Sequence, residues 1–210
     1  MPEAVVLDFD GVVLESVDVK TRAFAALFER EGREAADRIV AYHVANGGIS
    51  RYEKFRWAYR EVLRRPLAQD EEERLGAEFN RLVEEAVVAA EWVPGAREFL
   101  ESHHGRLPLY VASGTPQDEL RRIVRRRDLE RYFRGVYGAP DTKDKIIAAV
   151  AADLGCPPSA LVMVGDAIND LHGAEKAGAR FIGRRGAADF PAGTTLIDDL
   201  RALPAALGAL

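Results

Sequence analysis

The architecture of this chain can be predicted from one segment near its N-terminus, Ala4-Val5-Val6-Leu7-Asp8-Phe9-Asp10-Gly11. Its apolar run is continuous rather than alternating, which is typical of a central parallel strand covered by helices on both faces. Asp8 and Asp10 are two residues apart, so on a strand both side chains point the same way. They fall at the carboxyl end of this strand, where open α/β sheets place their ligands. Gly11 permits a tight turn there, so we expect the strand to lead directly into a functional loop.

Further apolar runs with helical patterns between them extend this prediction along the chain. The expected strands are Leu107–Ala112, Val136–Tyr137, Leu161–Gly165 and Ala179–Gly183, and the expected helices are 95–103, 116–130, 143–155 and 168–177. Strands that alternate with helices favour an α/β fold. We therefore predict a Rossmann-like, doubly wound and mostly parallel sheet.

One connection is far longer than the sheet requires. A parallel crossover needs roughly a dozen residues, whereas the interval from Asp8 to the strand expected at 107–112 is several times that length. Most of this interval is rich in helix formers, and its apolar residues recur at helical spacing. We expect residues 17–92 to form an inserted α-helical cap, and residues 1–16 and 93–210 to form the core domain that carries it.

Composition excludes several classes of protein. The chain has 210 residues, 48% of them hydrophobic and 30% charged, a balance that argues against disorder. Cys156 is the one cysteine, so an intramolecular disulfide and a multi-cysteine metal site are excluded. The formal net charge is −5, so we expect no nucleic-acid partner. No apolar run has the ~18 residues of a membrane span, and acidic residues interrupt any signal-peptide pattern. We expect a cytoplasmic protein without a membrane partner.

A second acidic cluster follows the strand expected at 161–165. Asp166 stands at the carboxyl end of that strand, and Asp170 falls one helical turn later, able to face the same space. Carboxylates that are held together repel each other unless a cation or a shared proton intervenes. Mg²⁺ prefers such oxygen ligands, and Mn²⁺ is an alternative for the same site. Capping of a helix N-terminus is the structural alternative for this cluster.

Two further polar groups follow strands. Ser113-Gly114-Thr115-Pro116 ends the second core strand, and we expect Thr115 to be the N-cap of a helix that begins at Pro116. The amides of such a terminus bind anions, and the Ser113 hydroxyl extends the site, although a simple capped helix has the same pattern. Lys143 follows the third strand and offers a positive charge, although a single lysine is usually solvated.

Taken in order, these groups form a pattern. The chain gives Asp-x-Asp-Gly, then Ser-Gly-Thr, then a lysine, then Gly-Asp-x-x-x-Asp, each after an expected strand and with a long insertion after the first. This pattern resembles the haloacid dehalogenase-like hydrolase superfamily, in its phosphatase and phosphomutase branch with a helical cap. The resemblance covers nearly the whole chain, and it implies an enzyme that acts on a small phosphorylated metabolite.

The resemblance implies a role for each acidic residue. Asp8 would be the nucleophile that forms an aspartyl-phosphate, and Asp10 would protonate the leaving oxygen and then activate water. Mg²⁺ would be held by the Asp8 carboxylate, the Asp10 main-chain carbonyl and Asp166, with Asp170 as a ligand or its neighbour. Aspartate at position 10 favours phosphate esters, because the dehalogenases of this superfamily resemble Asp-x-Tyr instead.

It also implies the phosphate ligands. Ser113, the Gly114 amide and Lys143 would surround the phosphoryl oxygens, where preorganised positive groups stabilise the charge of phosphoryl transfer. Lys145 is the alternative lysine, although Lys143 fits the Gly-x-Pro-x-x-Lys spacing better.

The expected cap contains one more candidate. Gly48-Ile49-Ser50-Arg51 resembles the cap loop of sugar-phosphate enzymes of this superfamily, in which the arginine contacts the part of the substrate that does not react. Arg51 would suit a second phosphate or carboxylate. Alternatively, Ser50 caps the next helix and Arg51 is solvated. His43 and Lys54 are further polar candidates nearby.

Two alternatives to a phosphatase stay open. A sugar phosphomutase uses the same aspartyl-phosphate, and the motifs do not separate it from a phosphatase. A phospho-accepting receiver-like signalling module also combines acidic residues, a hydroxyl and a lysine, but it is shorter and has no large cap. The sequence does not predict the oligomeric state.

Overall fold

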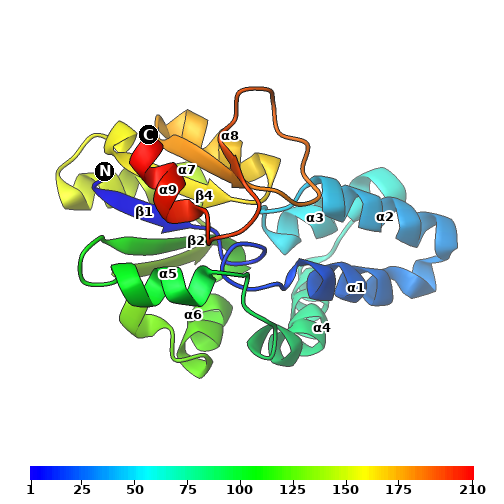
Figure 1. Cartoon of the computed structure of the whole chain (residues 1–210). Coiled ribbons are helices and arrows are strands. Elements are labelled where there is room, and N and C mark those ends of the chain that lie inside the picture. Colours follow the sequence, from blue (N-terminus) through cyan, green and yellow to red (C-terminus); the bar gives the residue numbers. More distant parts are fainter.

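The computed structural model describes all 210 residues, Met1 to Leu210. Its centre is one six-stranded sheet with the strand order β3-β2-β1-β4-β5-β6. Every neighbouring pair of strands is parallel. The strands are β1 (Ala4–Leu7), β2 (Leu109–Pro116), β3 (Gly135–Ala139), β4 (Leu161–Gly165), β5 (Arg180–Arg184) and β6 (Leu196–Ile197). The predicted Rossmann-like α/β fold is confirmed (Figure 1).

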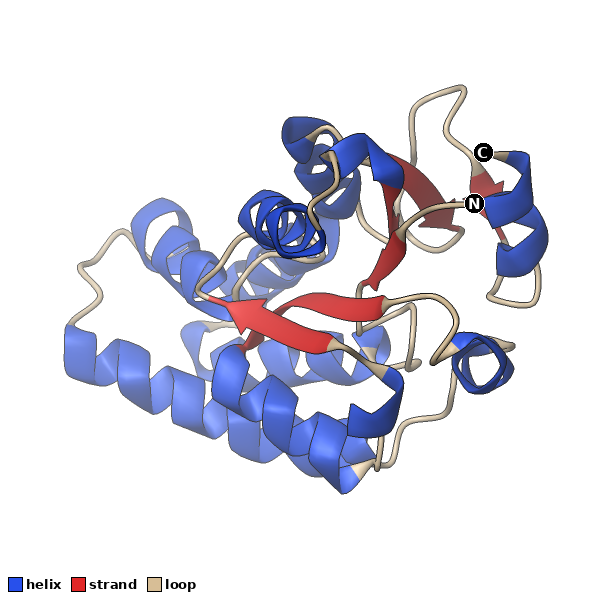
Figure 2. Cartoon of the chain, turned by 90° about the vertical axis from the view of Figure 1, so that its left-hand side faces the viewer, coloured by secondary structure: helices blue, strands red, loops and turns tan.

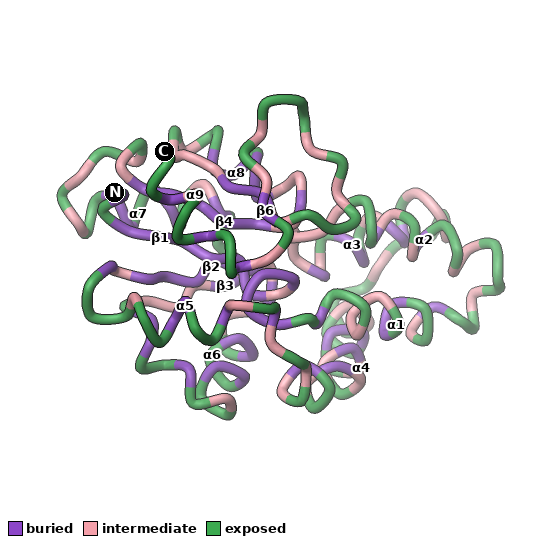
Figure 3. Tube along the Cα trace, viewed as in Figure 1, coloured by how far each residue is buried: buried purple, intermediate pink, exposed green.

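Helices cover both faces of this sheet, as Figure 2 shows. They are α5 (Ala96–His103), α6 (Gln117–Arg126), α7 (Lys143–Leu154), α8 (Ile168–Ala177) and α9 (Leu203–Ala209). Val5 and Leu7 of β1 pack into the cluster that contains α5, α6 and α9, whereas Ala4 and Val6 pack toward α7 and α8. This burial on both faces explains the continuous apolar run of β1, which is drawn as buried in Figure 3.

The structure corrects the predicted shape of the first loop. β1 ends at Leu7, so Asp10 lies in a turn and not on the strand, and the argument that alternation aligns it with Asp8 was wrong. The turn forms because Gly11 has a φ of 75°, which L side chains rarely adopt, and its amide donates to the Leu14 carbonyl (2.8 Å). The turn directs Asp10 toward other partners, described below.

The second strand also differs from its prediction. β2 runs on through Pro116, with an irregularity in its pairing with β3, and α6 begins only at Gln117. Thr115 is therefore a strand residue, and the predicted helix N-cap there was wrong. The predicted helix over 116–130 is shorter and ends at Arg126. β6 and α9 were not predicted, because β6 has only two residues and α9 only seven, too few for a clear periodic pattern.

Four helices between β1 and α5 lie together beyond the carboxyl ends of the strands (Figure 1). They are α1 (Val17–Phe28), α2 (Arg33–Ala45), α3 (Arg51–Trp57), which continues as a π-helical turn over Ala58–Val62, and α4 (Gln69–Val88). Buried aromatic rings pack between them, with the Phe24 centroid 5.6 Å from that of Phe55 and 4.9 Å from that of Phe79. Although α4 has 20 residues, neither it nor any other helix is long and apolar enough to cross a membrane.

The two connections to this helical segment run side by side. Leu14 and Trp92 form an antiparallel bridge. The amide of Glu15 donates to the Glu91 carbonyl (2.9 Å), and the amide of Val93 donates to the Val13 carbonyl (3.1 Å). The helical segment is thus joined to the sheet through a short two-stranded ribbon.

Candidate active site

The residues singled out in the sequence lie around the carboxyl end of the sheet. Asp8 follows β1 directly, and its side chain is almost completely buried. One carboxylate oxygen, Oδ1, accepts from the amide of Phe9 (2.6 Å), and Oδ2 accepts from Lys143 Nζ (2.8 Å). Burial raises the pKa of Asp8 well above its usual value; Lys143 opposes this rise, and Asp170, Asp166 and Asp10 add to it. An ionised Asp8 therefore needs positive charge beside it.

Lys143 supplies part of that charge. It is the first residue of α7, it is buried, and it forms ion pairs with Asp8 and Asp170. Burial would lower the pKa of Lys143, but the two carboxylates raise it above its ordinary value, so the amine stays protonated. Lys145, the alternative lysine, is exposed.

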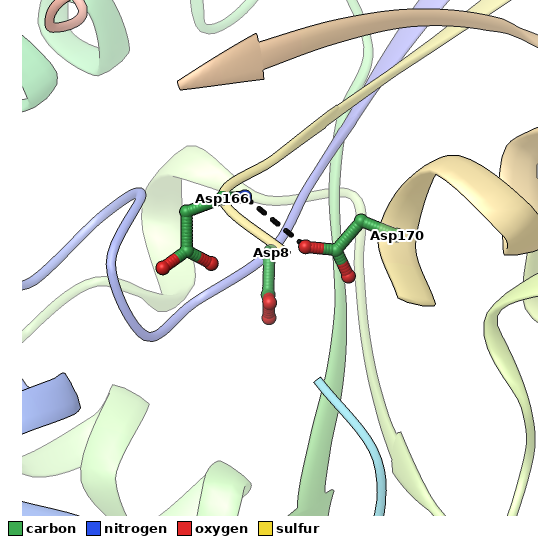
Figure 4. A group of neighbouring side chains, drawn as sticks. All are labelled: Asp8, Asp166 and Asp170. Carbon is green, nitrogen blue, oxygen red and sulfur yellow. Dashed lines mark hydrogen bonds between the residues drawn. The ribbon is translucent and has the colours of Figure 1, made fainter. Parts of the chain in front are cut away.

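Three carboxylates converge at the same place. Asp8, Asp166 and Asp170 each offer an oxygen within 4.8 Å of the other two, and their side chains lie close together in Figure 4. Asp170 is fixed by the backbone, because its Oδ2 accepts from the amides of Asp166 (3.1 Å) and Ala167 (3.0 Å). A side chain at Gly11 would place its Cβ 2.1 Å from Asp166 Oδ2, so this turn must be glycine for Asp166 to lie there.

This cluster fits a hard divalent cation. Asp166 takes part in no ion pair, and burial together with the negative charge of Asp170 raises its pKa to about 7. The negative charge of these three carboxylates is not fully balanced by positive groups of the protein. Carboxylate oxygens in such a cluster are typical ligands of Mg²⁺ or Mn²⁺. The residues present therefore fit the Mg²⁺ or Mn²⁺ that the sequence predicts.

Asp10 has its own set of partners. Its Oδ1 accepts from Ser16 Oγ (2.6 Å), and its Oδ2 is paired with Lys20 and accepts from Thr115 Oγ1 (3.3 Å). Burial would raise the pKa of Asp10, but Lys20 and the hydroxyl hydrogen bonds lower it. Lys20 also donates to Thr115 Oγ1 (2.8 Å). Sequence reasoning missed Lys20, because a single lysine on a helix carries no signal of a long-range partner.

The expected phosphate ligands lie beside this centre. Ser113 is buried, and its hydroxyl accepts from the amide of Thr115 (3.1 Å). Gly114 lies against the loop between α2 and α3, since a Cβ there would come within 2.7 Å of the Gly48 carbonyl oxygen. On the other side, Asn169 Nδ2 donates to the Gly47 carbonyl (2.9 Å). The loop of the helical segment thus rests on the end of β2 and the start of α8 and covers the site.

Arg51 lines the cavity beside the acidic centre, and the structure contradicts only the solvated alternative predicted for it. It is buried rather than solvated, and its Nη2 is 2.7 Å from Glu119 Oε1 of α6. Its guanidinium also lies 4.3 Å from the centre of the Phe79 ring. Ser50 does cap α3, accepting from the amide of Tyr52 at 3.4 Å. The charge of Arg51 is therefore already balanced within the protein, which the sequence could not show because Glu119 is distant in the chain.

Comparisons with known proteins agree with this arrangement. The family model described as haloacid dehalogenase-like hydrolase matches residues 2–178. A phosphorylated carbohydrates phosphatase of Thermotoga maritima is 26% identical over 84% of this chain and 82% of its own. A phosphoglycolate phosphatase of Pseudomonas fluorescens is 27% identical over 97% and 79% of the two chains. The solved structure of β-phosphoglucomutase from Clostridium difficile shares the fold, with a TM-score of 0.78 at 15% identity, covering 100% of this chain and 98% of that one.

Proposed function

This chain belongs to the haloacid dehalogenase-like hydrolases, and from that premise we propose that it is a phosphoric monoester hydrolase, which removes phosphate from a small phosphorylated metabolite through an aspartyl-phosphate on Asp8. The buried Asp8, held between the Phe9 amide and Lys143 beside two further carboxylates, is the observation that carries the proposal. The family match over 2–178 favours this hydrolase over a receiver-like signalling module.

The first step forms the intermediate. An oxygen of the Asp8 carboxylate attacks phosphorus, and the bond from phosphorus to the ester oxygen breaks. Lys143 and the Phe9 amide orient the attacking carboxylate. In this proposal the Ser113 hydroxyl and the Gly114 amide bind the phosphoryl oxygens. The leaving oxygen takes its proton from Asp10, which has to bind that proton before the step, because its contact with Lys20 favours the ionised carboxylate in the free protein.

The second step releases phosphate. Asp10, ionised after the first step, takes a proton from water, and that water attacks the phosphorus of the aspartyl-phosphate. The contacts from Lys20 and Ser16 favour the ionised form of Asp10, which suits this role. The products are inorganic phosphate and a free Asp8 carboxylate.

A divalent cation completes the site in this proposal. The Asp8, Asp166 and Asp170 carboxylates and the Asp10 main-chain carbonyl would hold Mg²⁺. When bound, it supplies positive charge to the phosphoryl oxygens and to Asp8.

We also propose that residues 17–92 act as a cap on a core made of residues 1–16 and 93–210. The ribbon at Leu14 and Trp92 would be its hinge, and the contacts of Gly47 with Asn169 of α8 and of Gly48 with Gly114 of β2 would mark its closed position. Closure excludes water from the site during the first step.

Phosphate release from a panel of phosphorylated sugars and acids, measured with Mg²⁺, tests this function. We expect release from a narrow set of esters, none from Asp8→Asn, and a quenched wild-type reaction that carries phosphate on Asp8 by mass spectrometry. A phosphomutase uses the same residues, so products are to be identified: conversion of one phosphosugar isomer to another without net phosphate release would establish the mutase instead.

A further inference from the structure

A cavity of about 920 Å³ lies between the helical segment and the strand ends. Asp8, Asp10 and Asp166 line it on the sheet side, and Lys54, His43 and Phe24 line it on the side of the helical segment. Its volume is that of a site for a small metabolite. A phosphate ester bound at Asp8 would therefore have its other end among the residues of the helical segment.

The basic side chains around this cavity differ in whether a carboxylate of the protein pairs with them. Arg51 is paired with Glu119, Lys20 with Asp10, and Lys143 with Asp8 and Asp170. Lys54 is in no ion pair, although only 4% of its surface is exposed. It is the buried lysine of the cavity that lacks a carboxylate partner.

The hydrogen bonds of Lys54 leave capacity for a ligand. Its Nζ lies 3.1 Å from His43 Nδ1 and 3.3 Å from the His43 carbonyl oxygen. An ammonium has three N–H donors, so with both of these contacts made one donor remains. The Phe24 ring stacks on His43 with a centroid separation of 4.2 Å and fixes the imidazole against which Lys54 rests.

We propose that Lys54, positioned by His43, binds a second anionic group of the substrate, a carboxylate or a second phosphate, and so determines specificity. The proposal rests on the proposed function for the identity of the reacting group. The assignment shifts this role from Arg51, whose guanidinium is already paired, to Lys54, whose ammonium is not.

The energetic situation of Lys54 supports this role. Burial, together with the nearby charge of Lys20, lowers the pKa of Lys54 to about 7. A buried ammonium without a counter-ion disfavours the folded state, and a bound anion would remove that cost. Lys54 would therefore stabilise a complex with an anionic substrate more than it stabilises the free protein.

Matched pairs of phosphate esters test the proposal. Glucose 1,6-bisphosphate is compared with glucose 1-phosphate, and 2-phosphoglycolate with 2-hydroxyethyl phosphate, so that within each pair only the second anionic group differs. The variants are Lys54→Met, Lys54→Arg and, as a control, Lys145→Met at an exposed lysine. For each protein the ratio of kcat/KM within each pair is measured, and affinities for the same esters are measured by calorimetry on the Asp8→Asn background.

We expect wild type to prefer the ester with the second anion in at least one pair, and Lys54→Met to lower that preference roughly 10- to 100-fold, mainly through KM. Lys54→Arg restores part of it, and Lys145→Met does not change it. The pair that responds identifies carboxylate or phosphate. The proposal would be overturned if Lys54→Met lowered kcat/KM equally for both esters of each pair. It would also be overturned if wild type showed no preference for the ester with the second anion, either in rate or in calorimetric affinity. If no ester is hydrolysed but the calorimetric preference depends on Lys54, the proposed function fails while this inference stands.

Discussion

Arg51 of α3 and Glu119 of α6 form a buried ion pair, with Nη2 2.7 Å from Oε1 and 5% of each side chain exposed. The pair joins the helical segment to the sheet side of the molecule. Neither partner has a second salt bridge, so the loss of one side chain would leave the other charge buried and alone.

We therefore expect Glu119→Ala to lower the free energy of unfolding by about 3–5 kcal/mol, because removing one member of a buried pair leaves an uncompensated charge. The double variant Arg51→Met with Glu119→Leu should recover most of this loss. Urea unfolding followed by circular dichroism measures both.

An exposed ion pair of α6 serves as the control for Glu119→Ala. Arg126 of α6 pairs with Glu85 of α4, and both side chains are exposed. Arg126→Met should cost less than about 1 kcal/mol. Equal losses for Glu119→Ala and Arg126→Met would show that burial of the Arg51 pair has no energetic effect.

Asp8→Asn should abolish turnover without lowering stability. Burial and the charges of Asp170 and Asp166 disfavour the ionised carboxylate, and asparagine has the same shape without that charge. We expect kcat to fall by at least ~10⁴-fold, while Tm in metal-free buffer stays equal to or above that of wild type. A lower Tm for Asp8→Asn would mean that the ion pair of Asp8 with Lys143 stabilises the fold by more than burial and repulsion from Asp166 and Asp170 destabilise it.

Mg²⁺ should stabilise the protein as well as activate it. A ligand that binds only the folded state at 100 times its Kd adds about 2.7 kcal/mol. We expect Tm to rise with Mg²⁺ concentration in wild type, activity to be lost with a chelator, and Asp166→Asn to need at least about 10-fold more Mg²⁺ for the same rise. A Tm that does not respond to Mg²⁺ or Mn²⁺ would remove the metal from the proposal.

We expect the free energy of unfolding to fall at acidic pH because of His43, which lies in the helical segment. Burial, and then the charge of Lys54, lowers the pKa of His43 from 6.5 to about 3. Below pH 6.5 the unfolded chain binds a proton that the folded chain does not, so the stabilising contribution of neutral His43 is lost as pH falls from 6.5 toward 3.

His43→Gln removes this titration and keeps an acceptor for Lys54. The free energy of unfolding of wild type minus that of His43→Gln should therefore rise with pH across this window, by up to ~1.4 kcal/mol per pH unit. A difference that does not vary with pH would show that folding does not lower the pKa of His43.

The sequence was sufficient to predict which strands end at the site. Buried parallel strands align their carboxyl ends, so Asp8, Ser113 and Asp166 had to come near one another once the strands were recognised. Their local signals, a continuous apolar run followed by polar residues, lie within a few positions of each residue.

What could not be predicted depends on contacts between distant segments. Lys20 meets Asp10 and Thr115, and Arg51 meets Glu119, because the helical segment folds back over the sheet, and no local pattern encodes those partners. The early end of β1 was missed for another reason: its pairing with β2 and β4 ends at Leu7, and an apolar run alone does not mark where pairing ends.

The bridge between Leu14 and Trp92 brings the entrance and the exit of the helical segment together. A segment whose two ends are neighbours can be exchanged for another of different length without stretching or re-threading the sheet. The acidic centre belongs to the sheet, whereas Lys54 and His43 belong to the segment. If the proposed roles hold, the chain keeps the carboxylates of its reaction on the sheet and its choice of substrate on the segment, with Lys20 as the contact from the segment to Asp10.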